Sequence, residues 1–435
     1  MSHITRAIKI SPRQLFAPVA GVTIALLTAL ITALFISPLT ASLATAQTLP
    51  TEVTQGDPVT DYLDAIETAE AELSAYSVEL SDLYFGLGKS HFSKREYERA
   101  RQAYQRGMQI ERVNYGLDSI SQSPYLLSIA EAESYLGNWD QSHNALENLY
   151  QINAKAYGET DPRMLPVLDE LLDWYMTTYK ERTLNGAYQN LVISERLSNR
   201  MYRILVNSVP MDDPDAASRY RKISHLHYFI ANHIKQHGEP SESGLTINSS
   251  ATTRALDSTS HLHYRRGKAA LQKVIESLEQ QPDSSAVDKA LAIAELGDWY
   301  LVFGQRMSAS KTYKLAYDTL GENSEKGANL FDQPSMIEFT ALGDNLELAE
   351  SRNTQRSQSL PRRQLEVSMT VTKIGIPEKM EIIDPPEDIT KKEIRTIFRE
   401  IRSKRFRPRL VDGETINSNM VFPYLDKGSE SGSQI

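Results

Sequence analysis

Apolar and small residues between residues 84 and 110 recur with the period of an α-helix. Tyr84, Leu87, Gly88 and His91 have the spacing i, i+3, i+4, i+7, and Tyr97, Ala100, Tyr104 and Gly107 have the spacing i, i+3, i+7, i+10, so each set lies on one helical face. Small residues in these runs allow two helices to approach closely, and the aromatic residues fill the space between them. The stretch therefore predicts a helical hairpin, which needs stacked neighbours to bury its apolar face.

Comparable patterns recur along the chain and supply such neighbours. In each, small or apolar residues lie on one face of a first helix, which is followed by a turn and a second helix. The positions that show this best are Leu126, Ile129, Ala130, Gly137 and Leu146, then Leu168, Leu172 and Tyr175, then Ile293, Gly297, Tyr300, Ala309 and Tyr313. The partner helix of the third hairpin is expected at about 187–206. Helices at 219–237 and 263–280 form a further hairpin, interrupted by a polar, mobile insert at 238–260. We expect about five hairpins within residues 61–321.

This pattern resembles the tetratricopeptide repeat (TPR), whose signature places Leu, Gly, aromatic and Ala residues at these spacings. The positions that carry the resemblance are Leu87, Gly88, Ala100, Tyr104, Ala130, Gly137, Gly297, Tyr300, Ala309 and Tyr313. His91 and Arg112 depart from the signature, which has Tyr and Pro there. The resemblance implies a TPR-type α-solenoid with a concave surface for a protein or peptide.

The periodicity changes to that of a β-strand from residue 364. Leu365, Val367, Met369 and Val371 alternate with polar residues, which predicts a half-buried strand. A second strand is expected at 379–383, then a helix capped by Asp388 or Thr390 with an apolar stripe over 394–401. Strands at 406–410 and 416–424 follow, joined by a turn at Asp412-Gly413.

This ββαββ order, with its turn residues, resembles the TonB C-terminal domain over residues 364–425. The matching positions are Gly375, Arg405, Phe406, Pro408 and Gly413. The resemblance implies a small α+β fold that meets extended peptides by strand addition. The Pro-rich spacer and the leading Tyr-Pro segment of a true TonB are missing, so energy transduction is not inferred.

The N-terminus has the pattern of an export signal. Arg6, Lys9 and Arg13 precede an uncharged apolar run over 15–36, and an A-x-A site ends at Ala46. We expect residues 1–46 to be a signal peptide cleaved after Ala46, which places the protein in the periplasm. The apolar run is also long enough for an uncleaved inner-membrane anchor, and the chain then associates with the membrane and faces the periplasm.

Composition excludes several classes of function. The 435-residue chain has a net charge of −9, which argues against general nucleic-acid binding. It contains no Cys, so disulfides, Cys-ligated zinc and thiol catalysis are excluded. Gly86 to Ser90 resembles the end of a phosphate loop but lacks the first Gly and lies within a predicted helix. We therefore expect no nucleotide and no other cofactor.

Two clusters of ionisable residues remain. Most of the nine His lie between 225 and 263, where Ser-His-Leu-His-Tyr occurs twice and His233 and His237 are spaced for one metal ion. We expect them to be packing or surface residues and predict no metal site. A basic cluster comprises Arg395, Arg399, Arg402, Lys404, Arg405, Arg407 and Arg409. It is either a solvated face or a contact with an acidic partner, with anionic lipid or with the chain's own acidic repeats.

The sequence thus predicts a mainly α protein without catalytic or cofactor-binding residues. A linker at 47–60 precedes the repeats of 61–321; a linker at 322–363 precedes the domain of 364–425, and 426–435 is expected to be a disordered tail. The leading hypothesis is a non-enzymatic exported scaffold for protein–protein interaction in the bacterial cell envelope, with a protein or peptide partner. The alternative is a TonB-like transducer or adaptor that engages an envelope partner by strand addition.

Overall fold

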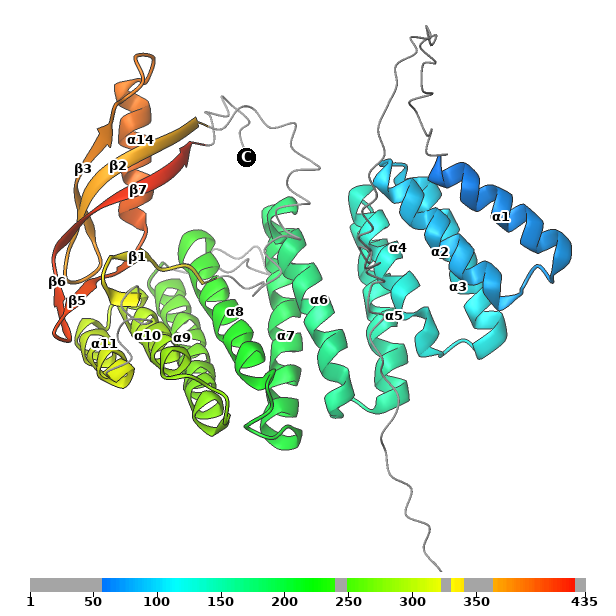
Figure 1. The fold of residues 1–435 in the computed structure, drawn as a ribbon, viewed down its shortest axis with the longest axis horizontal. Coiled ribbons are helices and arrows are strands. Elements are labelled where there is room, and N and C mark those ends of the chain that lie inside the picture. The colour runs from blue at the N-terminus through cyan, green and yellow to red at the C-terminus, as the bar shows by residue number, and fades with distance from the viewer. Residues whose placement is uncertain (1–56, 239–248, 322–329, 340–362, 427–435) are drawn as a thin grey trace, which may run out of the picture. The chain divides into compact units, whose positions relative to one another are not determined.

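The computed structural model describes residues 57–238, 249–321, 330–339 and 363–426 (Figure 1). The predicted signal peptide, most of the linker at 47–60 and nearly all of the C-terminal tail lie outside the described residues. Within the described part, the chain is mainly α-helical and ends in a small α+β region, which confirms the predicted fold class.

The helices of the array pack as successive antiparallel hairpins. α1 spans Pro58–Glu72 and packs against α2. The hairpins that follow are α2 (Val78–Ser93) with α3 (Tyr97–Tyr115), α4 (Ser123–Tyr135) with α5 (Trp139–Tyr157), α6 (Leu165–Thr178) with α7 (Leu184–Ser208), α8 (Ala216–His237) with α9 (Ser249–Gln280), and α10 (Ala286–Val302) with α11 (Arg306–Leu320). Figure 1 shows them following one another in chain order, as in a TPR-like solenoid.

Glycines let the two helices of a hairpin cross closely. A Cβ atom on Gly88 of α2 would lie 2.4 Å from the Tyr104 ring of α3, and one on Gly297 of α10 would lie 2.5 Å from the Tyr313 ring of α11. Both tyrosines are buried, so neither ring has free space into which to move. The first and last hairpins therefore share one packing solution, in which a tyrosine ring covers a glycine.

One apolar core continues through the stacked helices. It includes the fully buried side chains Leu146, Leu172, Met201, Leu226 and Leu271, which come from three successive hairpins. Burying a side chain of this size stabilises the fold by about 1.5–3 kcal/mol. Because each hairpin contacts mainly its neighbours, its stability depends on them.

The insert predicted at 238–260 is shorter in the structure. α8 ends at His237 with Gly238 in a left-handed conformation (φ 75°), and residues 239–248 lie outside the described part. α9, however, already begins at Ser249, so the prediction of a loop is wrong for 249–260. A packed helix gains one hydrogen bond for each residue added, which allows it to extend into a polar stretch.

The C-terminal domain is a three-stranded antiparallel sheet with one helix. β2 (Arg363–Val371) lies between β3 (Pro377–Ile383) and β7 (Ser418–Asp426). The buried residues of β2 alternate as predicted, and they pack against Ile397 and Ile401 of α14 (Lys391–Ser403). Thr390 caps α14 in a reciprocal pair of hydrogen bonds with Glu393.

The predicted strand at 406–410 is divided into two. β4 (Phe406–Arg407) and β5 (Arg409–Val411) are separated by Pro408, which cannot donate a backbone hydrogen bond. β5 pairs with β6 (Glu414–Ile416) across the predicted turn. β4 pairs instead with β1 (Ser335–Met336), a two-residue strand within the predicted linker 322–363.

The described part of that linker is packed against the fold. Phe331 and Phe339 are buried, and β1 pairs with β4. The rest of the linker, up to residue 362, lies outside the described residues. Burial of two aromatic rings outweighs the polar character of the segment.

Candidate protein-interaction site

The C-terminal domain is joined to the last hairpin by a buried ion pair. Arg407 of β4 donates from Nε to Oδ1 of Asp298 in α10 over 3.1 Å and from Nη2 to Oδ2 over 2.5 Å. The two side chains are only 9% and 7% exposed. Two parallel hydrogen bonds from one guanidinium fix both distance and orientation. β4 therefore has a defined position on α10.

Tyr313 extends this contact into the repeat packing. Its hydroxyl donates to Oδ1 of Asp298 over 2.8 Å, while its ring covers Gly297. Burial and the neighbouring Asp298 carboxylate raise the pKa of the Tyr313 hydroxyl well above its usual value. Tyr313 therefore stays a neutral hydrogen-bond donor. It connects the α10–α11 contact at Gly297 to the Asp298–Arg407 pair that holds the C-terminal domain.

The positions that resemble TonB form the same junction. Gly375 has φ of 69°, and a Cβ atom there would lie 2.2 Å from the carbonyl oxygen of Phe406, so only glycine fits. The amide of Phe406 donates to the carbonyl of Gly375 over 3.1 Å, and the Phe406 ring is fully buried. Pro408 is buried beside them, and Gly413 forms the β5–β6 turn next to Lys314 of α11.

The segment of residues 330–339 crosses from α11 to α8. Phe331 packs near Tyr317 of α11, and Phe339 lies 4.7 Å from the Tyr228 ring of α8 and 5.6 Å from the Trp299 ring of α10, measured between ring centroids. The amide of Ile337 donates to the carbonyl of Arg405 over 2.9 Å. The chain's own residues therefore occupy one face of α8 and α10.

A cleft lies beside this segment, between α8, the α10–α11 turn and the C-terminal domain. Its volume is about 660 Å³, within the range of sites that bind ligands. Apolar side chains form much of its wall: Ile234, Leu301, Val302, Phe303, Ile374 and Ile376. We refer to it as the junction cleft.

The cationic groups of the junction cleft are Lys235, Arg306 and Arg405, and the residues that line it include no Asp or Glu. Arg405 donates to the carbonyl oxygens of Arg402 and Lys404, which directs its side chain without neutralising it. Within the described ranges, none of the three cations forms an ion pair with a carboxylate. Burial raises the pKa of the Tyr228 hydroxyl, and the charge of Arg405 opposes that shift. The cleft is thus both apolar and positive.

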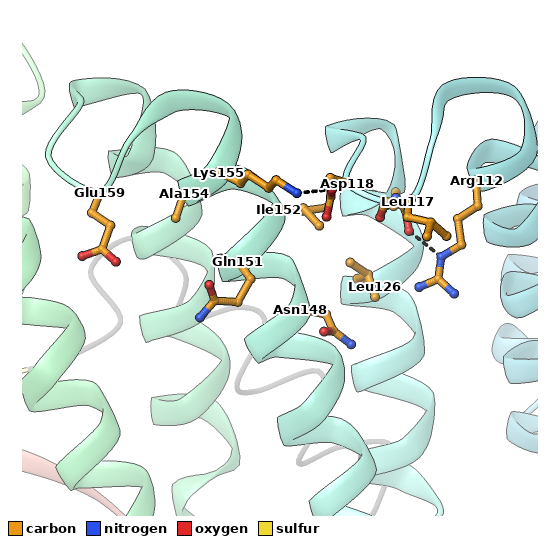
Figure 2. A pocket seen from close by; sticks show the side chains of 11 residues that line it. Arg112, Leu117, Asp118, Leu126, Asn148, Gln151, Ile152, Ala154, Lys155 and Glu159 are labelled. Carbon is orange, nitrogen blue, oxygen red and sulfur yellow. Dashed lines mark hydrogen bonds and ion pairs between the residues drawn. The ribbon is translucent and has the colours of Figure 1, made fainter.

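A second hollow, of about 480 Å³, lies at one end of α4 and α5 (Figure 2). Four of its polar side chains are engaged with one another: Lys155 pairs with Asp118, and Arg112 donates to Gln122 over 2.6 Å. Both charges are in balance in its walls, and four of the eleven lining residues are apolar. This hollow therefore offers a ligand less than the junction cleft does.

The two Ser-His-Leu-His-Tyr copies meet across the α8–α9 hairpin. Nδ1 of His227 lies 3.0 Å from Nδ1 of His263, so the equivalent histidines of the two copies hydrogen-bond each other. Burial, with a smaller effect of neighbouring positive charge, lowers the pKa of His227 to about 3 and that of His263 to about 4. Both are therefore neutral packing residues at neutral pH.

The spacing of His233 and His237 brings their rings to 4.9 Å between centroids. Nδ1 of His233 is already engaged by the Tyr179 hydroxyl at 2.6 Å. Among the described residues there is no group of three or more His, Asp or Glu that could hold a metal ion. The phosphate-loop-like residues 86–90 lie inside α2, where Gly86 packs against Tyr62.

Ion pairs between first helices, which the sequence pattern did not reveal, connect the hairpins. Lys222 of α8 lies 3.1 Å from Asp169 and 3.0 Å from Asp173 of α6, and Nε of Arg221 lies 2.8 Å from Glu295 of α10. Burial raises the pKa of the Glu295 carboxyl, and Arg221 opposes that shift. Since Glu295 and Asp298 lie one turn apart, α10 is paired with α8 and with β4 along one face.

The remaining predicted positions are distributed as follows. Leu87, Ala100, Ala130 and Ala309 are buried at helix contacts, Tyr300 is half-buried, and Gly137 forms the α4–α5 turn. In the basic cluster, Arg395, Arg399 and Arg402 are exposed on α14, whereas Arg407 contacts the chain's own repeats. The described part of the chain contains no helix long and apolar enough to cross a membrane.

No known protein-family model matches this chain, and neither does any curated protein. Among solved structures, it is similar to a crystal structure of nearly identical TPR-like repeats from Podosopora anserina, with 15% identity and a TM-score of 0.36 over 57% of this chain and 98% of that one. It is also similar to BtubC (BKLC) from P. vanneervenii, with 12% identity and a TM-score of 0.35 over 63% of this chain and 94% of the other.

Proposed function

We propose that this protein is a non-enzymatic exported scaffold that mediates protein–protein interaction in the bacterial cell envelope. The observation that supports this most is an array of helical hairpins that ends in a rigidly docked domain and an apolar, positive cleft. Such surfaces suit a protein or peptide partner. Several buried ionisable groups in the described part form internal pairs, as in Arg407–Asp298 and His227–His263.

Export is part of this proposal and rests on the N-terminal pattern. A positive segment, an apolar run and an A-x-A site at Ala46 favour a cleaved signal and a periplasmic protein. The alternative is an uncleaved anchor in the inner membrane that leaves the repeats on the same side. Fractionation of cells that express the full chain separates the two, because only the cleaved form is recovered in the periplasmic fraction.

The scaffold proposal is tested by cross-linking in cells that express the full chain. A photo-reactive residue is placed on exposed positions of α2, α5 and α8, and adducts are identified by mass spectrometry. We expect one recurrent protein partner, cross-linked from more than one position of the array. Turnover of a small molecule by the purified protein, without any recurrent partner, would contradict the proposal.

A TonB-like adaptor is the second candidate, and one observation favours it. β7 is an edge strand in the order β3-β2-β7, and its outer edge has no strand partner among the described residues. An extended peptide could pair there. Pro423 cannot donate to such a ladder and shortens the available edge.

The substitution Asn419→Pro distinguishes the two candidates. It removes a backbone donor from β7 outside the contacts between the C-terminal domain and α10. Loss of partner binding from an otherwise folded protein would favour strand addition, whereas unchanged binding would favour the repeats and the junction cleft.

A further inference from the structure

We propose that the junction cleft binds an acidic, extended segment of a partner protein, in which one large apolar side chain is flanked by carboxylates. The inference rests on the proposed function, since it assumes that the partner is a protein. It adds to that function the position of the contact and the chemistry of the bound segment.

Charge complementarity determines the choice of occupant. The chain as a whole has a net charge of −9 and therefore repels acidic segments in general. The junction cleft is an exception, with Lys235, Arg306 and Arg405 around it and no carboxylate in its lining. Lys235 and Arg306 are exposed, so they can turn towards a ligand at small cost. Carboxylates are thus attracted to the cleft, although the molecule as a whole is acidic.

The apolar wall adds a second requirement. Phe303 and Val302 at the end of α10 face Ile374 and Ile376 in the turn between β2 and β3, and all four are only half-buried. Covering such groups with an apolar side chain is favourable, at roughly 25 cal/mol per Å² of apolar surface. A uniformly charged ligand would leave this wall exposed, so the ligand needs an apolar residue between its carboxylates.

The cleft is preorganised for binding. Its walls come from α8, from α10 and from the C-terminal domain, and the last two are joined by the Arg407–Asp298 pair and by the Phe406 amide on Gly375. A rigid site loses less conformational entropy when it binds. The cleft is a recess and not an extended basic stripe, which favours a short peptide segment over a nucleic acid or a lipid surface.

The experiment uses the purified full chain and a fluorescently labelled peptide, Asp-Glu-Phe-Asp-Glu, followed by anisotropy. Two control peptides replace the acids by Asn and Gln, or Phe by Ser. We expect saturable binding of the first peptide alone, weakened by high salt. The double variant Lys235→Gln/Arg306→Gln should weaken binding about tenfold, while its charge-matched control Arg395→Gln/Arg399→Gln on α14 should not. Both pairs are exposed, so unchanged thermal unfolding shows that the variants are folded.

The inference is overturned if the acidic peptide binds no better than the neutral one, or if only the α14 variant reduces binding. It is also overturned if the chain self-associates through the cleft, seen as a dimer in sedimentation that the cleft variant abolishes. These outcomes are distinct from failure of the scaffold proposal. A recurrent cross-linked partner that the cleft variant still binds would refute the cleft alone, whereas absence of any partner would refute the scaffold.

Discussion

Replacing Arg407 by Met is expected to loosen the C-terminal domain from the last hairpin. The Met side chain retains much of the apolar stem but leaves Asp298 with a single partner, the Tyr313 hydroxyl. Because the side chains of Arg407 and Asp298 are 9% and 7% exposed, water cannot replace the lost contact without local opening. Removing one partner of a buried ion pair costs about 3–5 kcal/mol. We expect a decrease of this size in the free energy of unfolding of the last hairpin and its docked domain.

The double variant Arg407→Met/Asp298→Asn tests whether the unpaired charge of Asp298 causes the loss of stability. The charge that the first substitution leaves unpaired is now absent, so the double variant should recover a large part of the lost stability. Urea unfolding followed by circular dichroism gives the free energies, and hydrogen exchange of peptides from β4 and α10 locates the change. If Arg407→Met lowers the free energy of unfolding by less than about 1 kcal/mol, as expected for an exposed ion pair, the buried Arg407–Asp298 pair does not hold the domain in place. A double variant as unstable as the single one would refute its electrostatic origin.

Three further predictions concern other parts of the chain. Gly297→Leu should displace the Tyr313 ring and cost about 1–3 kcal/mol; unchanged thermal unfolding would show that this crossing is not tight. The depressed pKa values of His227 and His263 mean that protonation favours the unfolded chain, so stability should fall as pH decreases from about 6.5 towards 4. At pH 5 the loss is about 2 kcal/mol for each histidine relative to pH 7. The variant His227→Leu/His263→Leu should remove most of this loss in urea titrations at the two pH values, and His233, whose pKa is also lowered, accounts for a remainder. Mass spectrometry of the exported protein should show Gln47 as its first residue, and an intact Met1 in the membrane fraction would favour the anchor instead.

The repeats were accessible to sequence reasoning because their packing is periodic. Gly88 and Tyr104 belong to two helices whose contacts recur every turn, so spacing alone indicates which residues face each other. The same holds for β2, where alternation identified the buried face. The hairpin over 219–280 was also predicted. The start of its second helix was missed because residues 249–260 are polar and show no apolar periodicity.

The junction between the domains was not accessible in this way. Arg407 and Asp298 are separated by 109 positions and belong to no periodic pattern. Arg407 is one of seven basic residues in the cluster, and the sequence did not show which of them forms an ion pair with the repeats. Its position next to the buried Phe406 was the one feature that distinguished it. Phe339 lies in a polar stretch that resembles a linker. Long-range contacts of single residues depend on tertiary structure, which local pattern does not encode.

We propose above that the array and its docked domain bind an acidic segment of a protein partner. The most direct measurement places a photo-reactive residue at Phe303 in the junction cleft and, as a control, at the exposed Leu315 of α11, in cells that express the full chain. Adducts are digested and the cross-linked partner peptide is sequenced. We expect one recurrent acidic peptide with a large apolar residue from position 303 and none from position 315. Equal adducts from both positions, or peptides without acidic residues, would contradict it.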